Sequence, residues 1–393
     1  MAITDKEQGV WELDQVYNKI NEGGIWSYTG EENQMWAWGD NSYGQLGVNN
    51  KTRYSSPIQV SGNWVMWPGT TTTRGNAFFS KTGSDLWVTG GGSIIGQNST
   101  LYTYSSPIQI PGSWNKVYMS GSAIGSKTDG TLWGWGYNEN GELAQNNSIQ
   151  QISSPIQIGT DTTWTGEVVA GDGASAAIKT DGSLWTWGSG LRGGTGVNTS
   201  IKISSPTQIP GTWANATLQS GGGVATFISV KSNGTLWMWG NSASGETGNN
   251  ETAAQYRSSP TQVGTGTDWA SAVTGGYNMA CTKTNGSLWV WGTNNEGPLG
   301  LNQGPGSWTG GAYSSPTQLP GTWSTTQGEI QIGRSFAGIK ADGTLWTQGS
   351  NVYGELGHDN VVYLSSPTQI PGTDWGGQIQ IATWAGQMFV GKP

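Results

Sequence analysis

The chain has 393 residues, of which 65 are glycine and 24 are tryptophan, and only 11% are charged. The tryptophans bring large areas for burial and exclude a disordered chain, and glycines without a three-residue period exclude collagen. A net charge of -8, with 17 thinly spread basic residues, argues against nucleic-acid binding, which needs a cationic stripe.

The first segment, residues 1–31, differs from everything after it. Its apolar residues follow helical spacing up to Gly23-Gly24, which would stop a helix. A helix of about three turns is marginal alone, so we expect a short helical or extended leader that anchors the protein to another surface. The expected anchoring residues are Trp11, Leu13, Val16, Tyr17, Ile20 and Trp26. The string GVWELDQVYNKINEGGIW resembles leaders of structural proteins of tailed phages.

The same leader has no apolar core of the kind that a secretory signal peptide needs. No apolar run in the chain approaches the ~18 residues of a membrane span. We therefore expect neither Sec-type secretion nor membrane insertion.

From about Glu32 onwards, two markers recur seven times each at a period of about 46 to 57 residues. One is W-x-W-G or a decayed form of it, and the other is S-S-P-x-Q. A further tryptophan follows most S-S-P-x-Q marks. Periods of this length, with glycine-rich turns and short β-type runs, are typical of propeller blades. The leading tryptophans are Trp36, Trp87, Trp133, Trp185, Trp237, Trp289 and Trp346.

One repeat predicts a blade of four strands. The segments VVAG (168–171), ASAAIK (174–179), SLWTWG (183–188) and SSPTQI (204–209) are short and β-like, and Asp181-Gly182 is a hairpin turn between the second and third. The proline of the fourth segment suits an outer edge, where a missing N–H costs no ladder bond.

The two ends of the repeat region complete each other. Placing Lys392-Pro393 before Glu32 restores the pattern of Lys179 through Trp185. The sequence therefore predicts an all-β, seven-bladed propeller over residues 32–393, whose first blade closes by pairing the N- and C-terminal segments. Closure removes the free sheet edges that invite aggregation.

Several segments carry a family resemblance: WAWGDNSYGQLG (36–47), WGWGYNENGELA (133–144), WGTNNEGPLG (291–300) and QGSNVYGELG (348–357). They resemble the regulator of chromosome condensation repeat, and the resemblance implies a seven-bladed propeller over roughly residues 32 to 393. It implies little about function, because such propellers serve many roles. The second blade, WVTGGGSIIGQN, has lost the motif, and the family's usual histidine between the first and second strands is missing.

Catalytic chemistry is not expected. With Cys281 and His358 as the single cysteine and histidine, most triads and metal centres cannot be built, so we expect no enzyme, no metal and no cofactor. Cys281 reads as a small buried residue and His358 as a surface residue. Equivalent acids at one repeat position suggest loop-ordering hydrogen bonds to backbone N–H groups rather than a catalytic pair. These acids are Glu142, Glu246 and Glu355.

A lysine also recurs at one position of each repeat, before the hairpin turn. We expect each stem to pack over a neighbouring tryptophan and each ammonium to meet local acids, although a functional cationic band stays open. These lysines are Lys81, Lys127, Lys179, Lys231, Lys283, Lys340 and Lys392.

Tryptophans outside the repeat pattern are candidates for function. Trp308 sits in a lengthened, glycine-rich loop, and Trp384 lies between the first and second strands of the closing blade. Either could contact a ligand or partner, because function concentrates in loops on rigid scaffolds. Filling a gap in the packing is an equally good explanation for both.

The main functional hypothesis is a non-enzymatic virion component of a tailed phage: a capsid ornament, a tail-associated protein or a receptor-binding protein, assembled in the host cytoplasm. Its expected partners are other virion proteins, through the leader, and a host surface glycan or protein; oligomerisation stays open. The alternative is a cellular propeller scaffold for protein–protein interaction or GTPase regulation. A third hypothesis, a glycan hydrolase, needs two acids facing each other near the axis.

Overall fold

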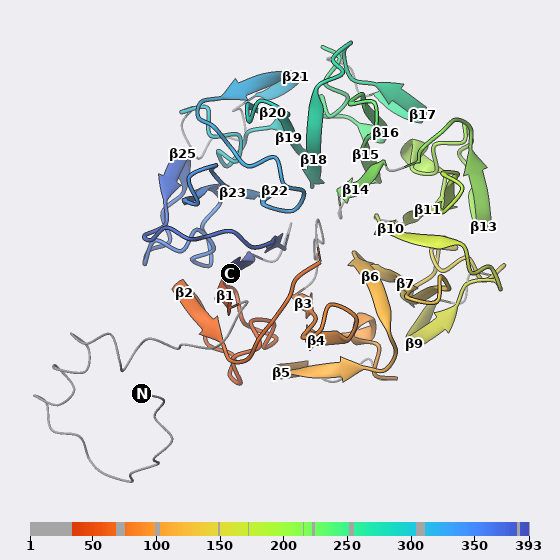
Figure 1. Cartoon of the computed structure of the whole chain (residues 1–393), viewed down its shortest axis with the longest axis horizontal. Coiled ribbons are helices and arrows are strands. Elements are labelled where there is room, and N and C mark those ends of the chain that lie inside the picture. Colours follow the sequence, from red (N-terminus) through yellow and green to blue (C-terminus); the bar gives the residue numbers. More distant parts are fainter. Residues whose placement is uncertain are drawn as a thin grey trace, which may run out of the picture. The chain divides into compact units, whose positions relative to one another are not determined.

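Strands around a central axis make up the protein (Figure 1). In the described part of residues 33–393, which form one compact unit, seven antiparallel sheets lie like blades around that axis. The prediction of an all-β, seven-bladed propeller is confirmed. The computed structural model describes residues 34–67, 75–98, 103–147, 150–171, 173–214, 216–221, 225–250, 255–303, 311–382 and 386–392.

Blade IV shows how one repeat folds. Its strands β10 (Trp164–Ala170), β11 (Ala174–Lys179), β12 (Leu184–Ser189) and β13 (Lys202–Ile209) are hydrogen-bonded in that order from the axis outwards. Gly182 turns the chain between β11 and β12 with a φ of 78°, a conformation that glycine adopts without strain. The predicted strands are correct, and the inner one begins earlier, at Trp164.

The other blades repeat this order. Blade III comprises β6 (Trp114–Met119), β7 (Ser122–Lys127), β8 (Leu132–Tyr137) and β9 (Gln151–Gln157). Blade V comprises β14 (Thr217–Gly221), β15 (Thr226–Val230), β16 (Leu236–Ser242) and β17 (Gln255–Gln262). Blade VI comprises β18 (Trp269–Gly275), β19 (Asn278–Lys283), β20 (Leu288–Thr293) and β21 (Ala312–Leu319). Blade VII comprises β22 (Ile330–Ile332), β23 (Ser335–Ile339), β24 (Leu345–Gly349) and β25 (Leu364–Gln369).

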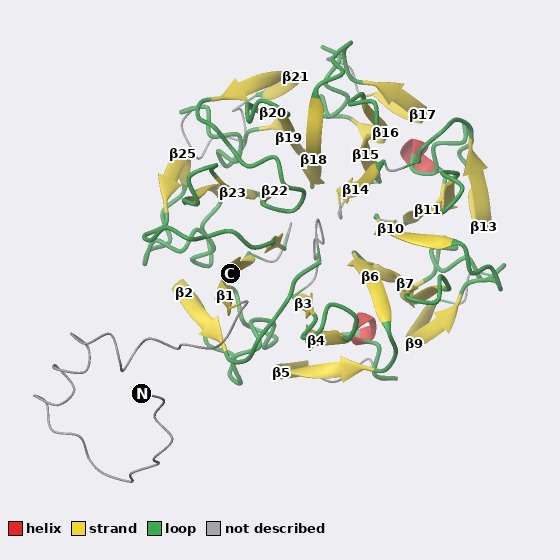
Figure 2. Ribbon diagram, viewed as in Figure 1, coloured by secondary structure: helices red, strands yellow, loops and turns green. Residues whose placement is uncertain are grey.

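Blade II is the irregular one. Its described sheet has three strands, β3 (Asn76–Phe79), β4 (Leu86–Gly91) and β5 (Thr103–Ile110), and an isolated bridge joins Val65 to Ser80. A 3-10 helix, η1 (Ser93–Ile95), stands where the repeat motif is lost. A second one, η2 (Leu191–Gly193), lies in blade IV (Figure 2).

Blade I contains both ends of the propeller. Its strands β26 (Ile379–Ile381) and β27 (Gln387–Lys392) pair with β1 (Gln34–Gly39) and β2 (Tyr54–Val60) in the order β2-β1-β27-β26. Gln34 faces Lys392 in the register, as the predicted closure requires. Among the described residues, the buried indole N–H of Trp36 has no hydrogen-bond partner, whereas that of Trp185 donates to the hydroxyl of Ser183.

The second tryptophan of W-x-W-G joins neighbouring blades. Trp187 is fully buried, and its indole N–H donates to the Glu142 carbonyl oxygen of the preceding blade at 2.6 Å. Trp38 does the same to Glu355 across the closing junction, at 2.7 Å. The same position joins neighbouring blades in most of the other repeats, and in blade VII it is occupied by Gln348, whose side-chain amide donates to a carbonyl oxygen of blade VI at 2.9 Å.

A second set of hydrogen bonds between neighbouring blades involves the serines of the S-S-P-x-Q motif. At each of the seven junctions, a residue with a φ between 54° and 60° donates its backbone N–H to a serine carbonyl of the next blade, at 2.6 to 2.9 Å. At most of them its side-chain oxygen also accepts from a serine hydroxyl, as Asn146 does from Ser205 at 2.6 Å. The seven residues are Asn49, Asn98, Asn146, Asn198, Asn250, Asn302 and Asp359.

Candidate interaction face

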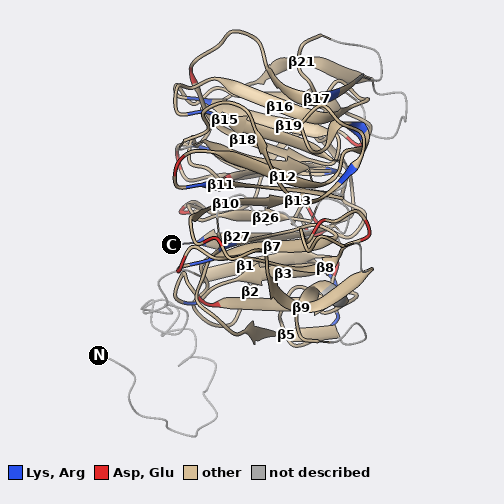
Figure 3. Cartoon of the chain, turned by 90° about the vertical axis from the view of Figure 1, so that its right-hand side faces the viewer, with Lys and Arg blue, Asp and Glu red and all other residues tan. Residues whose placement is uncertain are grey.

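The ring of blades has two faces of different construction. The turn face carries the hairpin turns between second and third strands, such as residues 179–183. The loop face carries the connections from first to second and from third to fourth strands. Figure 3 shows the molecule from the side, with acidic and basic residues close together along the turn face at the left.

On the turn face, the repeated lysines pack as predicted. The Lys127 ammonium lies 3.5 Å from the ring centroid of Trp133 and 5.2 Å from that of Trp114. Six of the seven lysines lie over two tryptophans in this way, and the described contacts place Lys392 over Trp375. Lys179 also pairs with Asp161 at 2.6 Å. The lysines are thus part of each blade's packing.

The turns of this face are also held by short local hydrogen bonds. The Asp129 carboxylate accepts from the Thr131 hydroxyl, and that hydroxyl accepts from the indole N–H of Trp133. The hydrogen bond from Thr131 lowers the pKa of Asp129. The same chain of contacts occurs at Asp181 and Asp342, so these aspartates serve the turns.

On the loop face, the repeated acids order their own loops. Glu142, Glu246 and Glu355 each accept a backbone N–H two residues earlier, at 2.6 to 2.7 Å, as predicted. Each lies in a different blade and each is almost completely buried. Burial raises the pKa of Glu246 to about 7 and also raises the pKa of Glu355.

The structure shows the positions of the single cysteine and the single histidine. Cys281 is buried in the core of blade VI, as predicted, and burial raises the pKa of its thiol. The prediction of a surface position for His358 is wrong. The ring is half-buried beside blade VII, where Nε2 lies 3.0 Å from the Thr347 hydroxyl, and burial lowers its pKa. The sequence alone did not predict this burial, because it depends on the loop of His358 folding back on its own blade.

In the described part of the chain, no cluster of His, Cys, Asp and Glu is suited to a metal ion, and no helix has the length and apolar character needed to cross a membrane. The predicted sites cannot be placed, because they lie outside the described residues and stay predictions. They are the leader residues Trp11, Leu13, Val16, Tyr17, Ile20 and Trp26 and the loop residues Trp308 and Trp384.

Exposed apolar side chains distinguish the loop face. Every exposed large hydrophobic among the described residues lies between a third and a fourth strand or at the start of a fourth strand. They are Tyr43, Leu191, Ile201, Tyr256, Val352, Val361 and Val362, with exposed fractions of 44 to 68%. The turn face contributes none to this set. Apolar side chains gathered on one side of a monomer are typical of a binding surface.

Charge adds to the difference. Basic side chains of the loop face reach solvent, whereas four of its acids, Asp40 and the three repeated glutamates, are buried. The basic residues are Lys51, Arg53, Arg192, Lys202, Arg257 and Arg334; the acids that reach solvent among the described residues are Glu139, Glu296 and Asp359. Among the described residues of this face, more basic than acidic side chains therefore reach solvent.

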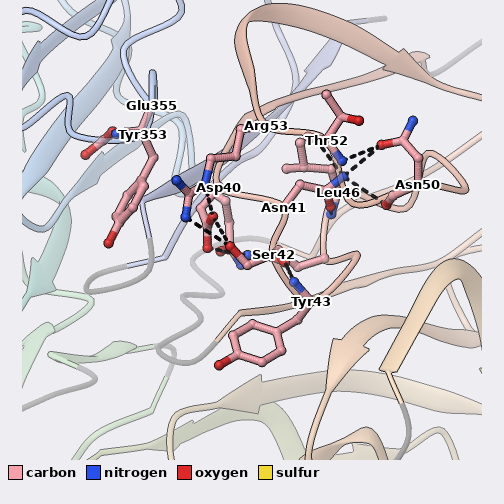
Figure 4. Close-up of polar contacts among 12 residues, drawn as sticks. Asp40, Asn41, Ser42, Tyr43, Leu46, Asn50, Thr52, Arg53, Tyr353 and Glu355 are labelled. Atoms are coloured by element: carbon pink, nitrogen blue, oxygen red, sulfur yellow. Dashed lines mark hydrogen bonds and ion pairs between the residues drawn. The ribbon is translucent and has the colours of Figure 1, made fainter.

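One group on this face has no counterpart in the other blades (Figure 4). Arg53 donates from Nε to Asp40 at 2.7 Å and from Nη2 to the Ser42 hydroxyl at 3.1 Å. Its Cζ lies 4.7 Å from the ring centroid of Tyr353, which belongs to blade VII. The group therefore bridges the junction at which the ring closes.

Repeat comparison could have found this pair. The place of Asp40 is taken by Tyr137, Ser189, Asn241, Thr293 and Ser350 in other blades, and the place of Arg53 by neutral residues or Lys202. Asp40 and Arg53 both differ from the residues at the same positions of the other blades. A blade can therefore fold without this pair, which makes the pair a candidate for function.

A hollow of about 250 Å³ opens on the same face between blades VI and VII. Its wall includes Tyr277, Asn278 and the ion pair of Glu296 with Arg334. Asn278 is 5% exposed, and its side-chain oxygen has no hydrogen-bond partner within the described part of the chain. The hollow provides a second place where a partner side chain could enter the loop face.

Two segments, residues 32–66 and 129–178, match the family model of the Regulator of chromosome condensation (RCC1) repeat. Human E3 ubiquitin-protein ligase HERC2 is 25% identical over 241 residues, covering 58% of this chain and 5% of that protein. RCC1 domain-containing protein RUG3, mitochondrial, of Arabidopsis thaliana is 25% identical over 232 residues, covering 55% of this chain and 51% of the relative. The chain thus spans about half or less of the length of these relatives.

Solved structures share the fold. Human WBSCR16 superposes with a TM-score of 0.74 at 18% identity, covering 92% of this chain and 99% of that one. Prp20p of Saccharomyces cerevisiae gives 0.76 at 14% identity, covering 93% and 92%. These likenesses show the propeller fold, and the match to the RCC1 repeat covers the two segments named above.

The predicted virion location is wrong. The relatives are cellular proteins of human and Arabidopsis thaliana, and a fold neighbour comes from yeast. The leader string that resembles phage proteins is about 20 residues long, and any short amphipathic segment has such a pattern. The cellular scaffold is the hypothesis that the comparisons favour.

Proposed function

We propose that this protein is a non-enzymatic cellular propeller that binds other proteins through its loop face. One observation carries the proposal: all exposed large hydrophobics of the described residues lie on this face. On the opposite face, lysines, aspartates and tryptophans are engaged with one another. A rigid ring that keeps one face closed and presents apolar and cationic side chains on the other is suited to recognition.

The fold neighbours support the class of function. Prp20p was described with its binding properties to Gsp1p and histones, and a structure of Kap60 bound to it is known. Those partners belong to Prp20p, and at 14 to 15% identity the likeness is one of fold. We take from it protein binding as the class of function, whereas the loop face as the binding surface is inferred from its exposed side chains.

Affinity capture with quantitative mass spectrometry tests the proposal. The wild type would be compared with a loop-face variant, Tyr43→Asp, Val352→Asp and Val361→Asp, and with a turn-face control, Thr128→Asp, Thr180→Asp and Ser232→Asp. All six positions are replaced by the same residue, so the controls match the added charge. We expect specific partners to be lost from the loop-face variant and retained by the control. Retention of every partner by both variants would contradict the proposal.

A further inference from the structure

The Arg53 group of Figure 4 presents an incompletely used cation to solvent. A guanidinium has five N–H donors. The described contacts use Nε and Nη2, and they leave Nη1 without a hydrogen-bond partner. The side chain is 54% exposed even though its counter-ion, Asp40, is 11% exposed. The positive charge therefore faces solvent and the negative charge lies beneath it.

This guanidinium is also held in place. Asp40 fixes Nε, and the Gln45 amide in turn donates to the second oxygen of Asp40 at 3.0 Å. Tyr353 supports one face of the guanidinium from the neighbouring blade. An arginine that is fixed by such contacts loses less conformational entropy when it binds a ligand, so its free donors are preorganised.

Apolar side chains lie on both sides of the group along the chain. Tyr43, next to Ser42, is 54% exposed, and Val352, next to Tyr353, is 44% exposed. Arginine and tyrosine are enriched at protein interfaces, where aromatic and guanidinium groups form the centre of the contact. Acids of the neighbouring blade are engaged in hydrogen bonds: Glu355 is buried and accepts the Tyr353 N–H, and the exposed Asp359 accepts from two serine hydroxyls of β2.

We propose that the surface formed by Arg53, Tyr353, Tyr43 and Val352 binds an acidic segment of a partner protein, with a carboxylate on the free donors of Arg53 and a neighbouring apolar side chain against Tyr43 and Val352. Carboxylates match the fork of N–H donors that arginine presents, and the solvent-exposed charge of Arg53 favours an acidic ligand. This inference rests on the proposed function, because it specifies what the loop face recognises.

Selection from a display library of random 12-residue peptides tests the inference, with the full-length protein as bait. We expect peptides that combine Asp or Glu with an aromatic or aliphatic residue. Their affinity, measured by fluorescence anisotropy, is expected to fall about tenfold or more in Arg53→Gln, because a charge-assisted bidentate contact is lost. Arg53→Lys is expected to recover only part of it, since an ammonium lacks the fork.

The matched control is Lys202→Gln, a change of another exposed loop-face cation in blade IV; it should leave the affinity unchanged. Thermal unfolding of all variants would verify the fold, which an exposed side chain hardly affects. Selected peptides without carboxylates, or acidic peptides that bind Arg53→Gln equally well, would overturn the inference. A phosphorylated copy of each peptide that binds while the carboxylate peptide does not would overturn it in favour of a phosphate ligand.

Failure of the inference and failure of the proposed function give different results. Peptides that lose affinity in the loop-face triple variant but not in Arg53→Gln would leave the proposed function standing and remove the acidic-segment proposal. A library that yields no peptide sensitive to either change would contradict both.

Discussion

The two faces of the propeller are built from the same seven repeats. They differ in whether their side chains contact one another or reach solvent. On the turn face, Lys127, Trp133 and Asp129 satisfy one another, and the arrangement recurs around the ring. On the loop face, Tyr43, Arg53 and Val352 reach solvent, and their pattern does not recur. The difference teaches that in a repeat protein the recurring residues build the blades, and the departures from recurrence show where recognition is to be sought.

The largest expected difference in the free energy of unfolding is between removing a repeated, buried aromatic side chain and removing an unrepeated, exposed one. Trp187→Ala should lower the free energy of unfolding by about 3–5 kcal/mol, because it removes a fully buried side chain and an interblade hydrogen bond. Tyr43→Ala should change it by no more than about 0.5 kcal/mol, because that ring is half-exposed. Urea titrations of both variants check this. Equal losses would show that the loop face is as structural as the core.

Glu246 allows a test of buried charge beneath the loop face. Since its pKa is raised from 4.5 to about 7, the folded protein holds the proton more tightly, and stability falls as the pH rises between these values. Glu246→Gln should therefore stabilise the protein by about 3 kcal/mol at about pH 8 and have little effect at about pH 4.

Thermal unfolding of the wild type and Glu246→Gln across this pH range is the measurement. Gln45 occupies the equivalent position in blade I, and its side-chain oxygen accepts the Tyr43 N–H, so the replacement fits the loop. A pH-independent difference between the two proteins would show that the carboxyl is solvated.

The closing junction can be compared with the other six. Asp359 accepts from the hydroxyls of Ser55 and Ser56, where the other junctions have asparagine. Asp359→Ala should destabilise by about 1–2 kcal/mol, because two hydrogen bonds are lost and alanine is strained at a φ of 57°. Asp359→Asn should cost less than about 0.5 kcal/mol. Chemical denaturation of both variants would decide, and an equal loss in both would mean that the negative charge matters more than the shape.

The smallest effect concerns the repeated lysines. Lys179→Met should cost about 0.5–1 kcal/mol, since it removes two cation–π contacts and a partly exposed ion pair with Asp161. Lys202→Met, at an exposed loop-face position, should cost nothing measurable. Melting curves at low and high salt provide the test. A loss at Lys202 equal to that at Lys179 would erase the distinction between the faces.

Sequence periodicity predicted the blades, the closure of the ring and the packing of the lysines, because the residues responsible recur in successive repeats. It could not predict the backbone hydrogen bonds of Asn146 and its equivalents, because an asparagine in a loop is compatible with many turns. It also could not show that Arg53 meets Tyr353, since these residues are 300 positions apart and are brought together only by closure of the ring. The structure thus adds an unrepeated ion pair to the candidate sites, and the unrepeated tryptophans stay predictions.

The central claim is that partners bind the loop face, and site-specific photo-crosslinking in cells tests it most directly. A photoreactive residue would replace Tyr43 or Val352 on the loop face and, in matched proteins, Asp181 or Asn233 on the turn face. If partners bind the loop face, the two loop-face positions should give discrete crosslinked partners and the turn-face positions none. Crosslinks of equal yield from both faces, or from the turn face alone, would contradict it.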